Sequence, residues 1–312
     1  MRKEVVKAHL EITDTEEIMK RREFLFTTLS GTAAFRMNFF IRGKLKTIYL
    51  NDSFFDKRED TIFTWLGMAG ALINCRGTII FIDPLISYGA NNETCESGNR
   101  LLVPLPITAD NVPKADFICY THADSDHFAE KSAKILNSRL APTFISPGPV
   151  IESLNKIGIE KSRLIKIKDF ATYSFGDVKI IITPALHDWQ KVNPWKREDC
   201  CGYLIRTPDG SIWHPGDTRL IPELEEIKNV DILFFDVAAV DSHLGPKGSA
   251  RLAETSGAKA MVAYHYGTFD LPPGSYGGCD PDDSLPYIKD LKALFLKPDP
   301  GEIIKLPINE KF

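Results

Sequence analysis

The sequence predicts an α/β protein of four layers, in which two β-sheets face each other and helices cover their outer sides (αββα). Three observations favour this fold class. The chain has 312 residues, 43% hydrophobic and 26% charged, as in ordinary globular proteins. Short apolar runs bounded by turn residues recur from residue 60 onward, as strands do. The runs form two groups of strands followed by helices, so each half of the chain predicts one sheet with its own helices.

In the first half, the predicted elements are strands at residues 61–73, 78–84 and 115–121 and a helix at residues 128–136. The first two strands would form a hairpin, because Cys75-Arg76-Gly77 between them is a turn sequence. Asp83-Pro84 ends the second strand, and a loop containing glycine and asparagine then extends to about Pro113. Since loops of this length are uncommon in compact domains, we expect this one to be functional.

In the second half, the predicted elements are strands at residues 177–187, 230–240 and 258–269, a hairpin at residues 202–218 and a helix at residues 283–295. The hairpin turns at Pro208-Asp209-Gly210, which is a turn sequence between two apolar runs. The other runs are continuously apolar and bounded by polar residues, which is typical of buried strands.

The charge, the apolar runs, the cysteines and the N-terminal residues of the chain bear on its domain organisation and partners. We expect an N-terminal extension at residues 1–59 and one domain at residues 60–312. The extension is predicted as a helix that begins at Asp14, in a cytoplasmic protein, or as a twin-arginine export signal at Arg21-Arg22. A net charge of −4 argues against nucleic-acid binding. No apolar run is long enough for a membrane span, and the six cysteines lack C-x-x-C spacing. We therefore expect a small-molecule substrate.

Histidines and aspartates gather at or just after the ends of the predicted strands. The seven residues are His122, Asp124, Asp126, His127, His187, Asp217 and His265. Loops at the ends of a rigid sheet are where functional sites form, whereas a structural histidine would lie in the middle of a strand. Imidazole and carboxylate groups are metal ligands in proteins. The pattern therefore predicts a metal site to which both halves of the chain contribute.

The order of these residues resembles the metallo-β-lactamase superfamily over residues 60–306. That superfamily has an H-x-H-x-D-H motif, a distant histidine, an aspartate in a G-D-T or G-D-S context and a last histidine after a strand. Here THADSDHF, HPGDT and HYGTF supply the matching residues, except that Asp124 stands where histidine is usual. The stretches TWLGMAG, YLIRTPDGSIWHPGD and HYGTF are most similar to the branch of L-ascorbate-6-phosphate lactonases.

The resemblance implies the αββα fold of that superfamily and two divalent metal ions. One ion would be held by His122, Asp124 and His187 and the other by Asp126, His127 and His265, with Asp217 bridging them. Zinc or manganese is expected, and iron is an alternative because a carboxylate at position 124 is a harder ligand than imidazole.

Such a centre implies a metal-dependent hydrolase of lactonase or esterase type. A hydroxide bridging the two ions would open a lactone or another ester, including that of a phosphorylated sugar acid, with Asp126 and Asp217 as catalytic residues. Two alternatives remain at this point. One is a diiron redox enzyme, since that branch of the superfamily carries a carboxylate at the place of Asp124. The other is a member that binds a metabolite without turnover.

Substrate residues and assembly are predicted less directly. The candidate substrate-binding residues are Trp189, His243 and Lys247, and Arg219 would be a second cation for an anionic group. His214 is expected either beside the metal ligands or as a buried structural residue. The lactonase resemblance also implies a homo-oligomer.

Overall fold

The computed structural model of the protein describes residues 45–308. The predicted N-terminal helix or export signal lies outside the described residues. The segment before the first strand contains a short 3-10 helix, Asp52–Phe55, whose two phenylalanines are buried. The Leu50 amide donates a hydrogen bond to the Pro106 carbonyl. Residues 45–59, which the sequence analysis assigned to the extension, therefore pack on the domain.

Two seven-stranded sheets form the inner layers, in the orders β14-β1-β2-β3-β4-β5-β6 and β13-β12-β11-β10-β9-β8-β7. The first sheet contains β1 Thr61–Gly67, β2 Gly70–Cys75, β3 Thr78–Ile82, β4 Phe117–Cys119, β5 Thr143–Ser146, β6 Leu164–Lys166 and β14 Ile303–Leu306. The second contains β7 Thr172–Phe175, β8 Val178–Pro184, β9 Cys201–Thr207, β10 Gly210–His214, β11 Ile232–Asp236, β12 Ala260–Tyr264 and β13 Leu294–Leu296. Strands β3 to β6 and β10 to β13 run parallel and the other pairs antiparallel, so both sheets are mixed.

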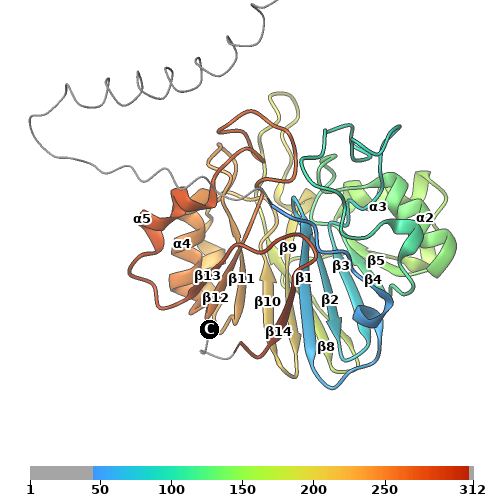
Figure 1. Ribbon diagram of the computed structural model, residues 1–312, viewed down its shortest axis with the longest axis horizontal. Coiled ribbons are helices and arrows are strands. Elements are labelled where there is room, and N and C mark those ends of the chain that lie inside the picture. Colours follow the sequence, from blue (N-terminus) through green and yellow to red (C-terminus); the bar gives the residue numbers. More distant parts are fainter. Residues whose placement is uncertain (1–44, 309–312) are drawn as a thin grey trace, which may run out of the picture. The chain divides into compact units, whose positions relative to one another are not determined.

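Helices cover the outer face of each sheet. Helices α2 Glu130–Leu140 and α3 Gly148–Lys156 lie on the side of β4 and β5, and α4 Gly245–Ser256 and α5 Leu285–Ile288 lie on the side of β11 to β13 (Figure 1). The four layers are therefore helix, sheet, sheet and helix. The predicted αββα sandwich is confirmed.

The alternation of apolar side chains along the strands explains the layers. In β3, Ile80 and Ile82 belong to the core between the two sheets, which also contains Trp213 of β10. Phe81, on the other face of β3, belongs to the core beneath α2 and α3, together with Leu136 of α2. Because successive side chains of a strand point to opposite faces, one continuous apolar run serves both cores.

Two predicted elements were wrong in detail. Residues 61–73 form two strands rather than one, because the chain reverses at Gly67 and Met68, whose φ angles are 101° and 48°. The predicted helix at residues 283–295 ends early, and β13 follows it and pairs with β12. Phe295 of β13 packs on Phe235 of β11, with ring centroids 5.2 Å apart. Burial against the sheet therefore overrides the local helical pattern.

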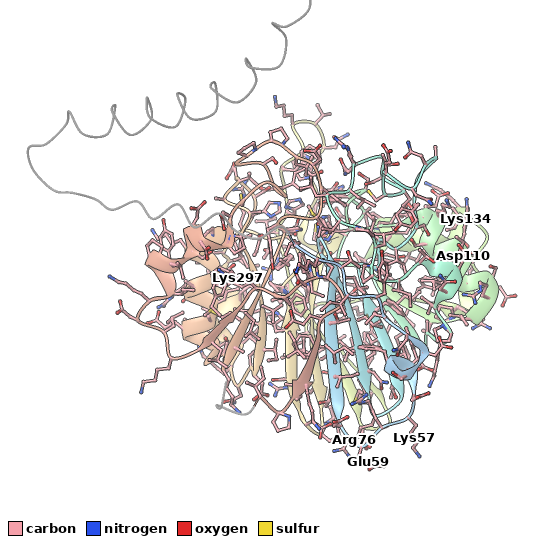
Figure 2. The ribbon with its side chains drawn as sticks, in the orientation of Figure 1. Lys57, Glu59, Arg76, Asp110, Lys134 and Lys297 are labelled. Atoms are coloured by element: carbon pink, nitrogen blue, oxygen red, sulfur yellow. The ribbon has the colours of Figure 1, made fainter. Side chains whose placement is uncertain are left out.

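A polar cluster ties the two sheets together at one end of the sandwich. Arg76, in the turn between β2 and β3, pairs with Asp209, in the turn between β9 and β10, at 2.7 Å. The Thr61 hydroxyl of β1 donates to the same carboxylate at 2.8 Å. Figure 2 shows Arg76 at this lower edge of the domain, near Lys57 and Glu59. The predicted site residues follow the opposite ends of the strands.

None of the helices within residues 45–308 has the length and apolar composition needed to cross a bilayer.

Candidate metal centre

The seven predicted ligands converge at one end of the sandwich. His122, Asp124, Asp126 and His127 follow β4 of the first sheet, and His187, Asp217 and His265 follow β8, β10 and β12 of the second. Each strand ends at this edge, so the loops that leave both sheets bring the side chains together. Their ligand atoms form two neighbouring clusters.

The first cluster consists of His122, Asp124 and His187. Asp124 Oδ2 lies 3.4 Å from His122 Nε2 and 3.3 Å from His187 Nε2. The indole N–H of Trp189 donates a hydrogen bond to the same oxygen at 2.8 Å. The aspartate that replaces the usual histidine thus lies within the cluster, and its carboxylate is held in place by a neighbouring tryptophan.

The second cluster consists of Asp126, His127, Asp217 and His265. His127 Nε2 lies 3.2 Å from Asp217 Oδ2 and 3.3 Å from His265 Nε2. His265 Nε2 lies 3.5 Å from Asp217 Oδ1, and Asp126 Oδ2 lies 3.7 Å from His127 Nε2. The four side chains therefore surround one point.

Asp217 lies between the two clusters, since its Oδ2 is also 4.0 Å from His122 Nε2 and 3.9 Å from His187 Nε2. Two ligands of one tetrahedral ion, with bonds of roughly 2.0–2.2 Å, lie about 3.3–3.6 Å apart, which is close to the spacings within each cluster. His122 Nε2 and Asp217 Oδ1 are buried and have no hydrogen-bond partner. Buried polar atoms are rarely left in that state, so the residues present fit metal ions.

Buried outer partners fix the direction in which the histidines point. Asp83 Oδ2 accepts a hydrogen bond from His127 Nδ1 at 2.8 Å, and Asp236 Oδ1 accepts one from His265 Nδ1 at 3.0 Å. A carboxylate only accepts, so Nδ1 carries the proton in both rings and Nε2 is left to face Asp217. This outer arrangement is typical of histidines that bind metals.

Neither Asp83 nor Asp236 was predicted as part of the site. Asp83 directly follows β3 and Asp236 is the last residue of β11, and the histidine partners are 44 and 29 residues away in the sequence. Both carboxylates are completely buried. An aspartate that directly ends an apolar run, as in FIDP and FFDV, was the signal available in the sequence.

Neighbouring histidines keep the buried aspartates ionised. Burial by itself raises the pKa of Asp217, but the charges of adjacent histidines, led by His127, hold it well below its usual range. Burial also opposes ionisation of Asp124, and the adjacent His122 and His187 rings nonetheless lower its pKa. In His127, burial is outweighed by the carboxylates of Asp217, Asp126 and Asp83, which raise its pKa well above normal. Metal binding must therefore displace protons here.

The predicted substrate residues lie in different surroundings, and not all of them line the site. His243 is buried between two carboxylates, with Nε2 3.2 Å from Asp217 Oδ2 and Nδ1 3.0 Å from Asp236 Oδ2. Trp189 lies beside Asp124, as described above. Lys247 is exposed on α4 and does not line the cavity at the site. His214 is a buried structural residue, since its Nε2 lies 2.8 Å from the Ala69 carbonyl oxygen.

A cavity of about 490 Å³ opens beside the two clusters. Its walls come from the loop after β4, the loop after β8, the loop after β11 and a segment between β12 and α5. The lining residues are Asp124, Ser125, Asp126, His187, Trp189, Asp217, Val240, Asp241, Ser242, His243, Ser275 and Tyr276. A small molecule in this cavity would reach both clusters.

Comparison with known families agrees with this geometry. Residues 78–266, more than half of the chain, match the family model described as "Beta-lactamase superfamily domain". The chain belongs to the metallo-β-lactamase superfamily. The resemblance seen in THADSDHF, HPGDT and HYGTF is confirmed at this level, whereas the lactonase branch is not distinguished by the match.

Relatives of this superfamily member carry names consistent with a metal centre. The chain is 28% identical over 249 residues to a protein of Pyrobaculum arsenaticum named "UPF0173 metal-dependent hydrolase", and the alignment covers 78% of this chain and 98% of that protein. A relative from Pyrobaculum aerophilum carries the same description and is 27% identical over 249 residues.

Solved structures of the superfamily share the fold at low sequence identity. The metallo hydrolase Igni18 of Ignicoccus hospitalis matches with a TM-score of 0.61 at 19% identity, over 80% of this chain and 99% of that one. The diiron β-hydroxylase CmlA of Streptomyces venezuelae matches with a TM-score of 0.60 at 18% identity, over 80% of this chain and 55% of that one. At these identities the likeness shows the shared fold alone.

Proposed function

We propose that the protein is a metal-dependent hydrolase that opens a lactone or another ester at the two clusters. The observation that carries this proposal is the convergence of seven histidine and aspartate side chains around Asp217, beside a cavity large enough for a small molecule. The names of the relatives, at less than 30% identity, agree with hydrolysis but do not specify a substrate.

The seven residues would form two metal positions. His122, Asp124 and His187 would hold one divalent ion, Asp126, His127 and His265 the other, and Asp217 would contact both. When bound, such ions activate water and polarise a carbonyl oxygen at neutral pH. The remaining chemistry is positioning and proton transfer by this chain's own side chains.

Asp126 and Asp217 are the proposed catalytic residues. Asp217 lies between the two clusters and lines the cavity, so its carboxylate can orient a water molecule there. Asp126 also lines the cavity and is partly accessible, so its carboxylate can accept a proton from that water and pass it toward solvent. Asp83 and Asp236 do not touch the cavity, and they act by holding His127 and His265.

The choice of metal follows from the first cluster. Two imidazoles and the Asp124 carboxylate suit zinc, manganese or iron, with more oxygen character than a three-histidine set. Iron would favour the redox alternative, for which the carboxylate at position 124 is the specific observation. Metal analysis with a visible spectrum separates the two, because a diiron protein is coloured and a zinc protein is not.

The test is hydrolysis by protein loaded separately with zinc, manganese and iron. A panel of lactones, carboxylic esters and phosphodiesters is followed by proton release, with wild type, Asp217→Asn and Asp116→Asn. Asp116 accepts a hydrogen bond from the Ile79 amide in the first sheet and serves as a matched control. Lactone or ester turnover that Asp217→Asn abolishes and Asp116→Asn retains supports the proposal. Turnover of phosphodiesters alone, or none with any metal, refutes it.

A further inference from the structure

The charge on the cavity walls points to the kind of substrate that it admits. Four aspartates line the cavity: Asp124, Asp126, Asp217 and Asp241. Asp241 is paired with Arg219, so Asp124, Asp126 and Asp217 are the three lining carboxylates that would face the two divalent ions. No lysine or arginine of residues 45–308 is among the lining side chains. A phosphorylated substrate would therefore find no net positive charge beyond the ions themselves.

The nearest candidate cation is already engaged. Arg219 Nε donates to Asp188 at 2.6 Å, and its Nη1 donates to Asp241 at 2.5 Å. Its guanidinium thus joins the loop after β8 to the loop after β11 and is neutralised by two carboxylates. Freeing it to bind a phosphate group would leave Asp188 and Asp241 without this partner.

One apolar and two aromatic side chains also line the cavity. Trp189, Val240 and Tyr276 line the cavity, and Trp189 is 55% exposed. The hydrogen bond from the Trp189 indole to Asp124 fixes the ring beside the first cluster. A large aromatic surface that is exposed yet held in place is suited to cover an apolar part of a ligand.

We propose that the cavity selects an uncharged lactone or ester with an apolar side chain and discriminates against the phosphorylated equivalent. This inference rests on the proposed function for its chemistry. Its physical basis is separate, namely the carboxylates and the absence of lysine and arginine on the described cavity wall, the engaged Arg219 and the exposed face of Trp189. Trp189 also has two separable features, since the ring faces the cavity and the N–H holds Asp124.

The kinetic experiment compares three lactones on the zinc- and manganese-loaded protein. They are γ-butyrolactone, γ-nonalactone with its apolar chain, and a γ-nonalactone analogue that ends in phosphate. We expect kcat/KM for γ-nonalactone to exceed that for the phosphorylated analogue by about tenfold or more. In Trp189→Ala the preference for γ-nonalactone over γ-butyrolactone should fall by about fivefold to tenfold, for the lost apolar contact. Trp189→Phe, which keeps a ring but loses the N–H, should retain that preference.

A binding experiment decides the inference even if no lactone is turned over. Isothermal titration calorimetry measures the affinity of the corresponding lactams, which resist hydrolysis, with metal content checked in each variant. Tighter binding of the neutral alkyl lactam, weakened in Trp189→Ala, supports the inference even where hydrolysis fails. Equal or tighter binding of the phosphorylated lactam overturns it. So does an alkyl preference that survives in Trp189→Ala. Tyr287→Ala, which removes an exposed aromatic of α5 outside the cavity, is the control and should leave both preferences unchanged.

Discussion

Asp83→Asn should weaken metal binding although Asp83 contacts no metal position. Asp83 Oδ1 accepts the Thr121 amide at 2.7 Å, and Oδ2 accepts the Thr121 hydroxyl at 2.7 Å and His127 Nδ1 at 2.8 Å. An asparagine of the same size has one N–H₂ group in place of an oxygen. In either orientation of the amide, a donor then faces a donor.

The consequence for His127 follows from its tautomer. With the amide nitrogen toward His127, Nδ1 must accept, so the proton moves to Nε2, the atom that lies 3.2 Å from Asp217. With the amide reversed, the Thr121 amide loses its acceptor, and the backbone that carries His122 is disturbed. Loss of an outer partner of this kind typically lowers metal affinity about 10- to 100-fold. That corresponds to about 1.4–2.7 kcal/mol.

The assay is competition with a chromophoric chelator at fixed pH, for zinc and for manganese, which resolves one or two bound equivalents. Wild type and Asp116→Asn should give the same affinities. With the amide nitrogen toward His127, Asp83→Asn should lose affinity at one of two equivalents, since only the second cluster contains His127. The reversed amide should also weaken the first cluster through His122. Binding of both equivalents within about threefold of wild type would refute the reasoning, because the tautomer would then not depend on Asp83.

Three further predictions concern other groups. Asp124→Ala should weaken the binding of one metal equivalent, measured by the same competition. Asp124→His should shift the metal preference toward zinc over manganese. Unchanged affinity in Asp124→Ala would remove Asp124 from the ligands. His265→Ala should lose one equivalent and reduce hydrolysis about a hundredfold or more, and it should also lower the Tm of the metal-free protein because Asp236 loses a buried partner. Hydrogen bonds from Arg76 lower the pKa of Asp209, so its contribution to stability is present above the ordinary carboxyl pKa and lost as pH falls through the lowered value. Asp209→Ala should accordingly lower the Tm by about 2–4 °C at pH 7 and by much less near pH 3, and an equal loss at both pH values would contradict the ion-pair account.

The residues of the candidate site could be predicted from the sequence, but their surroundings could not. The position of each ligand after a strand could be read from THADSDHF, HPGDT and HYGTF, because strand ends meet at one edge. Their burial could not, since His122, His127 and His265 are fully buried although they follow strand ends. Asp83 and Asp236 supply the buried partners of His127 and His265, and each of these pairs is a long-range contact without a local pattern.

The fold was predictable where apolar runs were long and unbroken. β11 and β12 are such runs. β13 has three residues in a stretch with helical pattern, and its state is decided by the contact with Phe235 rather than by local preference. α4 was not predicted because Gly245, Gly248 and Ser249 weaken its helical signal, and its buried small residues against β11 stabilise it instead.

The convergence of donors from both sheets has a consequence for motion. The sheets are joined covalently by the short segment after β6 and by the return from β13 to β14. An ion held between His127, after a strand of one sheet, and His265, after a strand of the other, would be a further non-covalent cross-link, at the end opposite Arg76 and Asp209. Such a cross-link would oppose separation of the sheets at that end, so the metal-loaded sandwich should open less often there than the metal-free one.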